Sequence, residues 1–237
     1  MFGNYIFDLY GTLVDIRTDE TGRILWKRLT DWYGMHGAFY SGAELRRRYL
    51  SLCAFEQGKR ADEYYEIELR NVFKALFEER DVGASDDLVE ETAIFFRVCS
   101  TKKLKVYPWV REAFDRIRSG GGGIFLLSNA QACFTVHELK KLGLAEAFDG
   151  IVLSSDAGVR KPDKRIMRLL LDKNGLDSRD CVMIGNDQHT DIAIAKAFGM
   201  NAVYVRTETS GEYDTTLAVE REVLDGDVHR LFELMEI

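Results

Sequence analysis

Long apolar runs are absent from this sequence of 237 residues, although 46% of its residues are hydrophobic. The longest runs, such as Ile124 to Leu127, have the length of a β-strand and fall far short of the roughly 20 residues that span a membrane. The N-terminus leads directly into a strand-like segment that ends at Phe7, so we expect no signal peptide. Together these absences predict a cytoplasmic protein with no membrane partner.

An excess of basic residues is also missing, because 32 Lys and Arg face 39 Asp and Glu and give a formal net charge of -7. This balance disfavours broad electrostatic contact with nucleic acid, so we predict no nucleic-acid partner. The few cysteines show no C-x-x-C spacing and the four histidines show no zinc-ligand spacing. We interpret the cysteines as buried free thiols in a reducing compartment: Cys53, Cys99, Cys133 and Cys181.

Residues 18 to 100 carry apolar side chains at helical spacing. Leu25, Leu29 and Tyr33 follow one another at intervals of four residues, and Leu69 and Phe73 do the same further on. This pattern predicts about four amphipathic helices joined by short turns, as in a small helical bundle.

After residue 103, strand-like and helix-like segments alternate. We expect strands at 124–127, 151–153, 181–184 and 202–205, and helices at about 131–142, 163–174 and 227–235. This alternation predicts an α/β fold with a doubly wound parallel sheet, covered by helices on both faces. The first strand, at 4–9, belongs to the same sheet, so an all-helical insert interrupts the α/β domain. We therefore expect an α/β core domain at 1–16 and 104–237 and a helical domain at 17–103.

Polar and charged residues follow the expected strands. Asp8 lies at the end of the first strand, Ser128 and Asn129 follow the strand at 124–127, Lys161 lies beyond the next strand, and the strand at 181–184 leads into residues 185–191. Singly, each of these residues has an ordinary structural role as a turn or helix cap, as Asp163 does. Because ligands bind where the carboxyl ends of parallel strands meet, the residues together predict a crevice with catalytic chemistry.

Four short segments in this order resemble the four motifs of the haloacid dehalogenase-like superfamily: FDLYGTLVD at 7–15, LSNA at 127–130, KPD at 161–163 and GNDQHTD at 185–191. The resemblance extends over nearly the whole chain and implies a hydrolase with a Rossmann-like core. The helical insert after the first motif resembles the C1-type cap of subfamily I.

The resemblance implies a role for each motif residue. Asp8 would be the nucleophile that forms a covalent intermediate, with Tyr10, Ser128 and Lys161 as its catalytic partners. Lys161 would offset the negative charge shared by nucleophile and substrate. The anionic group of the substrate would be bound by Gly11, Thr12, Ser128, Asn129 and Lys161.

A magnesium site follows from the same resemblance. Asp8, the main-chain carbonyl of Tyr10 and Asp187 would bind Mg²⁺, and Asp191 would lie behind these ligands and support them, directly or through water. An electrostatic argument points to a cation independently: carboxylates that converge on one site either take up protons or bind a cation. Ligation by oxygen alone, with room for water, suits Mg²⁺.

One position departs from the pattern of the phosphatases in this superfamily, which usually carry a second Asp two residues after the nucleophile as a general acid. This chain has Tyr10 there, and a tyrosine with an ordinary pKa near 10 is a poor proton donor at neutral pH. The sequence D-x-Y-G-T is also found in the 2-haloacid dehalogenases of the superfamily, whose departing halide needs no proton.

Three functions therefore stay open. The preferred one is a Mg²⁺-dependent phosphohydrolase that acts on a small phosphorylated metabolite through an aspartyl-phosphate at Asp8, because Asp187 is acidic as in the metal-dependent members. The alternative is a metal-independent 2-haloacid dehalogenase, with a substrate-binding arginine among Arg46, Arg47 and Arg48. A third is a non-catalytic module that binds a phosphorylated ligand. Substrate identity and oligomeric state have no signature in the sequence.

Overall fold

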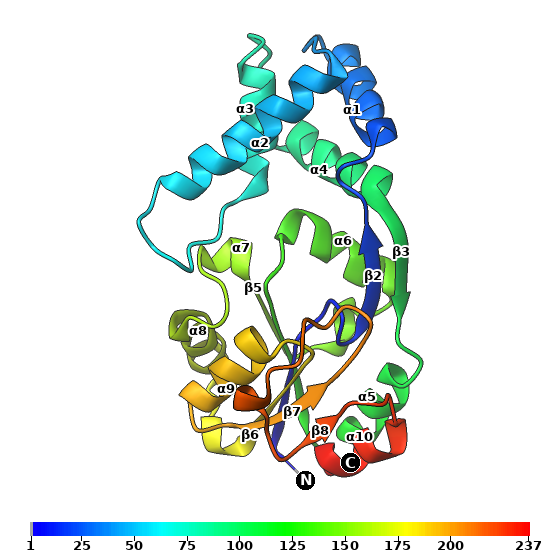
Figure 1. Cartoon of the computed structure of the whole chain (residues 1–237), viewed down its shortest axis with the longest axis vertical. Helices are drawn as coiled ribbons and strands as arrows, with labels where there is room; N and C mark the ends of the chain where they lie inside the picture. The colour runs from blue at the N-terminus through cyan, green and yellow to red at the C-terminus, as the bar shows by residue number, and fades with distance from the viewer. Residues whose placement is uncertain (1) are drawn as a thin grey trace.

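The structure is a computed structural model that describes residues 2–237. Figure 1 shows two stacked parts, an α/β part that contains the main sheet and a part made of helices α1 to α4, which we call the helical unit. The apolar side chains of the helical unit form a buried cluster of their own, separate from the two clusters on the faces of the sheet.

Within the described residues, six parallel strands form the main sheet in the order β5-β4-β1-β6-β7-β8. Their bounds are β1 Asn4–Phe7, β4 Gly123–Ser128, β5 Gly150–Leu153, β6 Cys181–Gly185, β7 Asn201–Val205 and β8 Glu222–Val223. Phe7 pairs in register with Leu126 on one side and Ile184 on the other, so β1, β4 and β6 end at the same edge.

Side chains alternate across the sheet, and each face is covered by helices. Tyr5 and Phe7 point toward α5 (Val110–Ser119) and α10 (Val228–Met235), whereas Ile6 points toward α8 (Lys164–Asn174) and α9 (Ala193–Ala197). The predicted doubly wound parallel sheet is therefore confirmed. Shorter elements complete the fold: α7 Ser154–Ala157, η1 Ala145–Ala147, η2 Ser178–Asp180, η3 Gln188–Ile192 and η4 Thr215–Leu217.

The helical unit contains α1 (Arg23–Met35), α2 (Gly42–Gly58), α3 (Leu69–Glu78) and α4 (Asp86–Ser100), as the apolar spacing predicted. Its centre is aromatic, and the rings of Tyr49, Phe73 and Phe96 contact one another with centroids 5.4 to 5.9 Å apart. Phe134 joins this cluster from α6 (Ala132–Leu142), which also contributes Leu139 to the core beneath the sheet. Helix α6 therefore packs against both parts.

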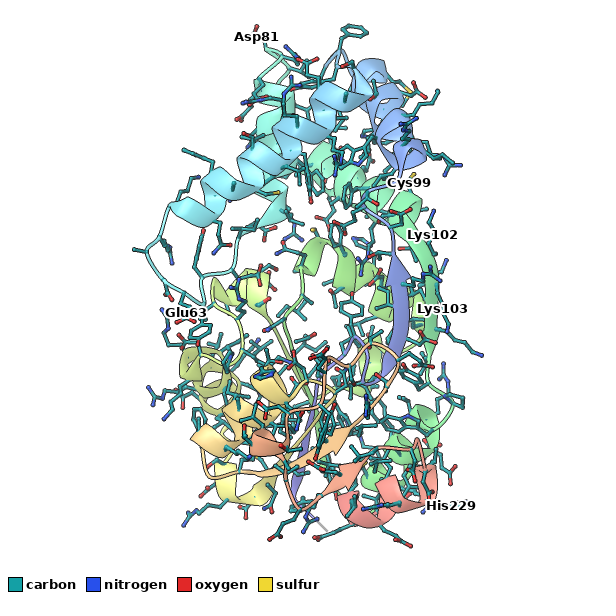
Figure 2. All side chains as sticks on the ribbon, in the orientation of Figure 1. Glu63, Asp81, Cys99, Lys102, Lys103 and His229 are labelled. Atoms are coloured by element: carbon teal, nitrogen blue, oxygen red, sulfur yellow. The ribbon has the colours of Figure 1, made fainter. Side chains whose placement is uncertain are left out.

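Two paired strands connect the parts. Strand β2 (Val14–Thr18) pairs antiparallel with β3 (Thr101–Val106), and Ile16 lies opposite Leu104. The alternation of polar and apolar residues in both segments explains the pairing. Lys102 and Lys103 are exposed on β3 (Figure 2), and Lys103 forms an ion pair with Asp15 across the ribbon.

Other features agree with the sequence interpretation or refine it. The four cysteines are free, but only Cys133 and Cys181 are fully buried. In the part of the chain that the structure describes, no helix combines the length and apolar character needed to cross a membrane.

The aromatic centre of the helical unit makes a stability prediction. Phe73 is 1% exposed, so Phe73→Ala should lower the free energy of unfolding by about 3–5 kcal/mol, because it removes ring contacts and leaves a cavity. The matched control is Phe39→Ala, since Phe39 is 74% exposed and its loss should change the free energy by less than about 0.5 kcal/mol. Denaturant unfolding of both variants measures the difference, and equal effects would contradict the packing described here.

Candidate active site

The four motifs meet at the carboxyl edge of the sheet. Asp8 follows β1, Ser128 ends β4, and Asp187 follows β6 after Asn186. Lys161 comes from the loop between α7 and α8, and its ammonium reaches Asp8. A cavity of about 230 Å³ opens here, and its lining includes Asp8, Tyr10, Gly11, Ser128, Asn129, Lys161, Asp187 and Asp191. The sequence-predicted residues are thus brought together, with Thr12 directly behind them.

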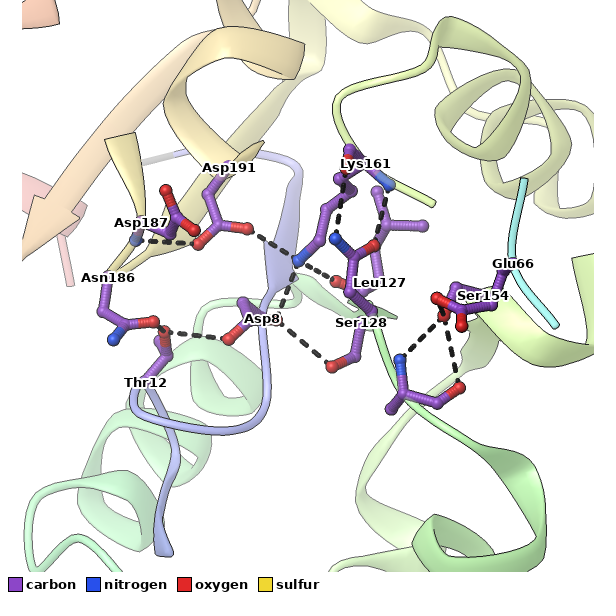
Figure 3. A network of polar contacts seen from close by, with 12 residues as sticks. Asp8, Thr12, Glu66, Leu127, Ser128, Ser154, Lys161, Asn186, Asp187 and Asp191 are labelled. Atoms are coloured by element: carbon purple, nitrogen blue, oxygen red, sulfur yellow. Dashed lines mark hydrogen bonds and ion pairs between the residues drawn. The ribbon is translucent and has the colours of Figure 1, made fainter. Parts of the chain in front are cut away.

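The Asp8 carboxylate is held by three side chains (Figure 3). Lys161 Nζ lies 2.7 Å from Oδ1, and the Ser128 hydroxyl donates to the same oxygen at 3.2 Å. The Thr12 hydroxyl lies 3.3 Å from Oδ2. Asp8 is 7% exposed and faces the cavity, so it is fixed in orientation and still accessible to a small molecule.

Lys161 is the centre of the charge arrangement. Its ammonium donates to Asp8, to Asp191 at 2.6 Å and to the carbonyl of Leu127 at 2.8 Å, while only 2% of the residue is exposed. Burial lowers the pKa of Lys161, but the two carboxylates more than offset this effect and hold the pKa above its usual value. Asn129 fixes the lysine backbone, because its amide accepts from Lys161 N at 2.7 Å and donates to Lys161 O at 3.1 Å.

Asp191 supports Lys161. Its second oxygen accepts the main-chain N–H of Asp187 at 3.1 Å, so each of its oxygens has a partner. Gly185 leaves space for this carboxylate, since a Cβ on Gly185 would come within 2.2 Å of it. Burial raises the pKa of Asp191 to about 7, Lys161 opposes this rise, and the nearby Asp8 adds to it. Two carboxyl groups, those of Asp8 and Asp191, share one ammonium, so the single positive charge of Lys161 cannot neutralise both of them.

Asp187 has a structural role and also faces the cavity. As one interpretation of the sequence proposed, its carboxylate caps the following turn η3 by accepting from His189 N at 2.8 Å. Among residues 2–237, there is no group of three or more His, Cys, Asp or Glu side chains that could hold a metal ion. A cation here would instead be held by Asp8, Asp187 and the Tyr10 carbonyl, together with water or substrate oxygens. This sparse oxygen ligation suits Mg²⁺.

A polar loop after β7, which no sequence motif identifies, lines part of the site. The Thr12 hydroxyl donates to the Asn186 side chain at 3.2 Å, and the Asn186 amide donates to Thr209 at 3.2 Å. Thr207 donates to the carbonyl of Gly11 at 2.7 Å. Gly11 has a φ of +86°, and a Cβ there would lie 2.2 Å from the Thr209 hydroxyl, so this turn requires glycine. The loop, which contains Thr207 and Thr209, follows β7. Its position at the end of a strand is the feature of the sequence that could have identified it as part of the site.

Tyr10 lines the cavity, but its hydroxyl points to α6. It donates to Glu138 and lies 3.0 Å from the Thr135 hydroxyl. Burial and the charge of Glu138 raise its pKa. A phenol with a raised pKa that donates to a carboxylate is not a proton donor for a leaving group.

A second cavity of about 330 Å³ adjoins the first, and Tyr10, Ile16 and Asn129 line both. Its charged residues are Glu20, Glu66 and Arg97. Glu66 accepts from Ser154 at 3.1 Å (Figure 3), and neither it nor Glu20 has an ion-pair partner among the described residues. Arg97, by contrast, is paired with Glu138.

Two groups of residues that we considered in the sequence lie outside the site. Arg46, Arg47 and Arg48 lie on α2, where the first two are exposed and Arg48 pairs with Glu79. Asp163 caps α8 by accepting from Arg165 N, which confirms its structural interpretation.

Known proteins are similar to this chain in sequence and in fold. A model of the haloacid dehalogenase-like hydrolases matches residues 4–199. A phosphoserine phosphatase of Thermus thermophilus is 29% identical over 134 residues, 56% of this chain and only 53% of that protein. A glyceraldehyde 3-phosphate phosphatase of Methanothermobacter thermautotrophicus is 28% identical over 185 residues, 76% of this chain and 77% of that protein.

Dehalogenases are similar as well. The (S)-2-haloacid dehalogenase 4A of Burkholderia cepacia is 24% identical over 209 residues, 86% of this chain and 82% of that protein. The crystal structure of a 2-haloacid dehalogenase of Pseudomonas syringae superposes with a TM-score of 0.69 at 20% identity, covering 100% of this chain and 99% of that one, which supports the fold. Because the family model covers most of the chain, this protein belongs to the haloacid dehalogenase-like hydrolases.

Proposed function

We propose that this protein is a Mg²⁺-dependent phosphohydrolase that acts on a small phosphorylated metabolite through an aspartyl-phosphate at Asp8. The observation that carries the proposal is the composition of the first cavity. A fixed carboxylate, Asp8, faces it beside the donors Ser128, Asn129 and Lys161 and a second carboxylate, Asp187. Donors on one side and carboxylates on the other suit a phosphoryl group bound together with a cation.

In the proposed reaction, the Asp8 carboxylate attacks phosphorus, forms an Asp8–O–P bond and breaks the bond to the ester oxygen. Ser128, Asn129 and Lys161 hold the phosphoryl oxygens, and Lys161 offsets their charge. Water then attacks phosphorus, which releases phosphate and restores the Asp8 carboxylate. Asp191 keeps Lys161 in place during both steps.

Mg²⁺ would be held by Asp8, Asp187 and the Tyr10 carbonyl, and it would supply positive charge against the oxygens of the transferred group. Asp8 and Asp191 share the single ammonium of Lys161, and Asp187 brings a third carboxylate to the same cavity; such crowding supports a cation at this position. Because the Tyr10 hydroxyl is committed to Glu138, the leaving oxygen takes its proton from water, and esters with good leaving groups should react fastest.

The alternative, a 2-haloacid dehalogenase, is favoured by Tyr10 and by the similarity to the Burkholderia enzyme. The second cavity argues against it. In the second cavity the carboxylate of a haloacid would meet no free cation among the residues that the structure describes, because Arg97 is paired with Glu138 and the other charged residues there are Glu20 and Glu66.

We further propose that the helical unit, at 17–103, is a cap over the core formed by 1–16 and 104–237. The two adjoining cavities, of about 230 and 330 Å³, have room for a small metabolite. The cap would exclude bulk water and select the substrate through the residues around Glu20 and Glu66.

The substrate class can be tested with p-nitrophenyl phosphate, whose leaving group needs no proton donor. We expect release of nitrophenol in Mg²⁺ and none in EDTA, and no chloride release from 2-chloropropionate in either. Chloride release that persists in EDTA would replace the proposal by the dehalogenase.

The nucleophile can be tested with Asp8→Asn, which should lower kcat by at least about 10³-fold because the amide cannot attack phosphorus. Asp163→Asn is the matched control, since asparagine also caps a helix and Asp163 lies outside the cavity. Its kcat should stay within about twofold of the wild type. Asp8→Asn activity close to that of the control would exclude the covalent mechanism.

The cation site can be tested with Asp187→Asn, which keeps a cap for η3 and removes one charge. The Mg²⁺ concentration for half-maximal activity should rise at least about tenfold, and the rise in melting temperature caused by Mg²⁺ should shrink. Asp214→Asn, at the cap of η4, is the control. An unchanged Mg²⁺ dependence in both variants would remove Asp187 from the site.

A further inference from the structure

A buried ion pair joins the helical unit to the α/β part. Arg97 of α4 donates to Glu138 of α6 through Nε at 2.6 Å and through its Nη2 at 3.3 Å. The two side chains are 13% and 8% exposed. The guanidinium also lies 5.1 Å from the ring centroid of Phe134. A pair this buried is expensive to break, because removal of one partner leaves an unpaired charge.

Tyr10 is attached to the same pair. Its hydroxyl donates to Glu138, and the Arg97 guanidinium lies 5.4 Å from the centroid of its ring. Three segments that are far apart in the sequence, at 10, 97 and 138, therefore meet at one carboxylate. One belongs to the loop after β1, one to the helical unit and one to α6.

The loop that carries Tyr10 also carries the proposed nucleophile. Tyr10 is two residues beyond Asp8, and its ring lines both cavities. The loop closes on itself through Gly11 N to Val14 O at 2.8 Å and Leu13 N to Leu9 O at 2.9 Å. The Tyr10 hydroxyl therefore connects the loop that carries Asp8 to α6 and, through Glu138, to Arg97 of the helical unit.

We propose that Arg97 and Glu138 are positioning residues that act on the Asp8 loop through the Tyr10 hydroxyl, so that the loop is fully ordered only when the helical unit is docked. The consequence for turnover rests on the proposed function, but the ordering of the loop does not. The other contacts between the two parts, such as the Arg165–Asp62 ion pair, do not involve Tyr10.

Kinetics of three variants test the proposal: Tyr10→Phe, the double variant Arg97→Met/Glu138→Leu, and the three changes combined. The double variant exchanges a buried ion pair for apolar residues of similar size, which proteins often tolerate, and its melting temperature is the folding check. Tyr10→Phe and the double variant should each lower kcat for p-nitrophenyl phosphate about tenfold, because the nucleophile is less well aligned. KM should change less than about twofold for Tyr10→Phe.

The combined variant separates positioning from independent effects. Tyr10→Phe and the double variant both remove the hydrogen bond between Tyr10 and Glu138, so the combined variant should have a kcat no more than about tenfold below that of the wild type, whereas independent effects would multiply to about a hundredfold. Asp62→Asn, which breaks another contact between the two parts, should stay within about twofold of the wild type. Multiplied effects, or a loss in Asp62→Asn as large as in Tyr10→Phe, would overturn the proposal.

Hydrogen exchange supplies a measurement that needs no turnover. In Tyr10→Phe and in the double variant, the amides of residues 11–14 should exchange faster than in the wild type, while those of β4 stay protected. Unchanged exchange at 11–14 would overturn the proposal. If the wild type hydrolyses no ester, the proposed function fails, and exchange alone decides whether the Asp8 loop is positioned by this pair.

Discussion

The ammonium of Lys161 is the constraint on which the site depends. It is buried at the carboxyl edge of a parallel sheet, and it binds Asp8, Asp191 and the carbonyl of Leu127 at once. A buried charge is tolerated only with such partners, so the positions of these groups are mutually dependent. Gly185 has no side chain where Asp191 must lie, and Asn129 clamps the Lys161 backbone. The Asp8 carboxylate thereby receives a fixed direction before any substrate binds.

The second organising feature is the attachment of the helical unit. On one side the β2–β3 ribbon connects it to the sheet, and on the other the segment before α3 binds α8 through the Arg165–Asp62 pair (Figure 1). Between these attachments, Arg97 reaches Glu138 and Tyr10. Movement of the helical unit would change these contacts, and under the proposed positioning role of Arg97 and Glu138 it would also change the order of the Asp8 loop.

Local patterns in the sequence were sufficient for the fold and for much of the site. Apolar spacing predicted α1 to α4, alternation predicted the parallel sheet, and the strand ends located Asp8, Ser128, Lys161 and Asp187. The family resemblance is confirmed, while the roles assigned to these residues remain predictions.

Contacts between distant segments were not predictable in the same way. The partner of the Tyr10 hydroxyl is 128 residues away on α6, and no spacing within either segment encodes that meeting. Arg97 reads as an ordinary polar residue of an amphipathic helix, and only the packing of α4 on α6 buries it. The pairing of β2 with β3 was not predicted for the same reason, because the whole helical unit separates the two strands in the sequence and neither segment indicates its partner.

The central claim, that Asp8 attacks phosphorus, is tested most directly by mass spectrometry of protein quenched in acid during turnover of p-nitrophenyl phosphate with Mg²⁺. We predict the mass of one phosphoryl group on the peptide that contains Asp8, and its absence in Asp8→Asn. Continued turnover with no phosphoryl group on that peptide, or with the group on another residue, would contradict the account.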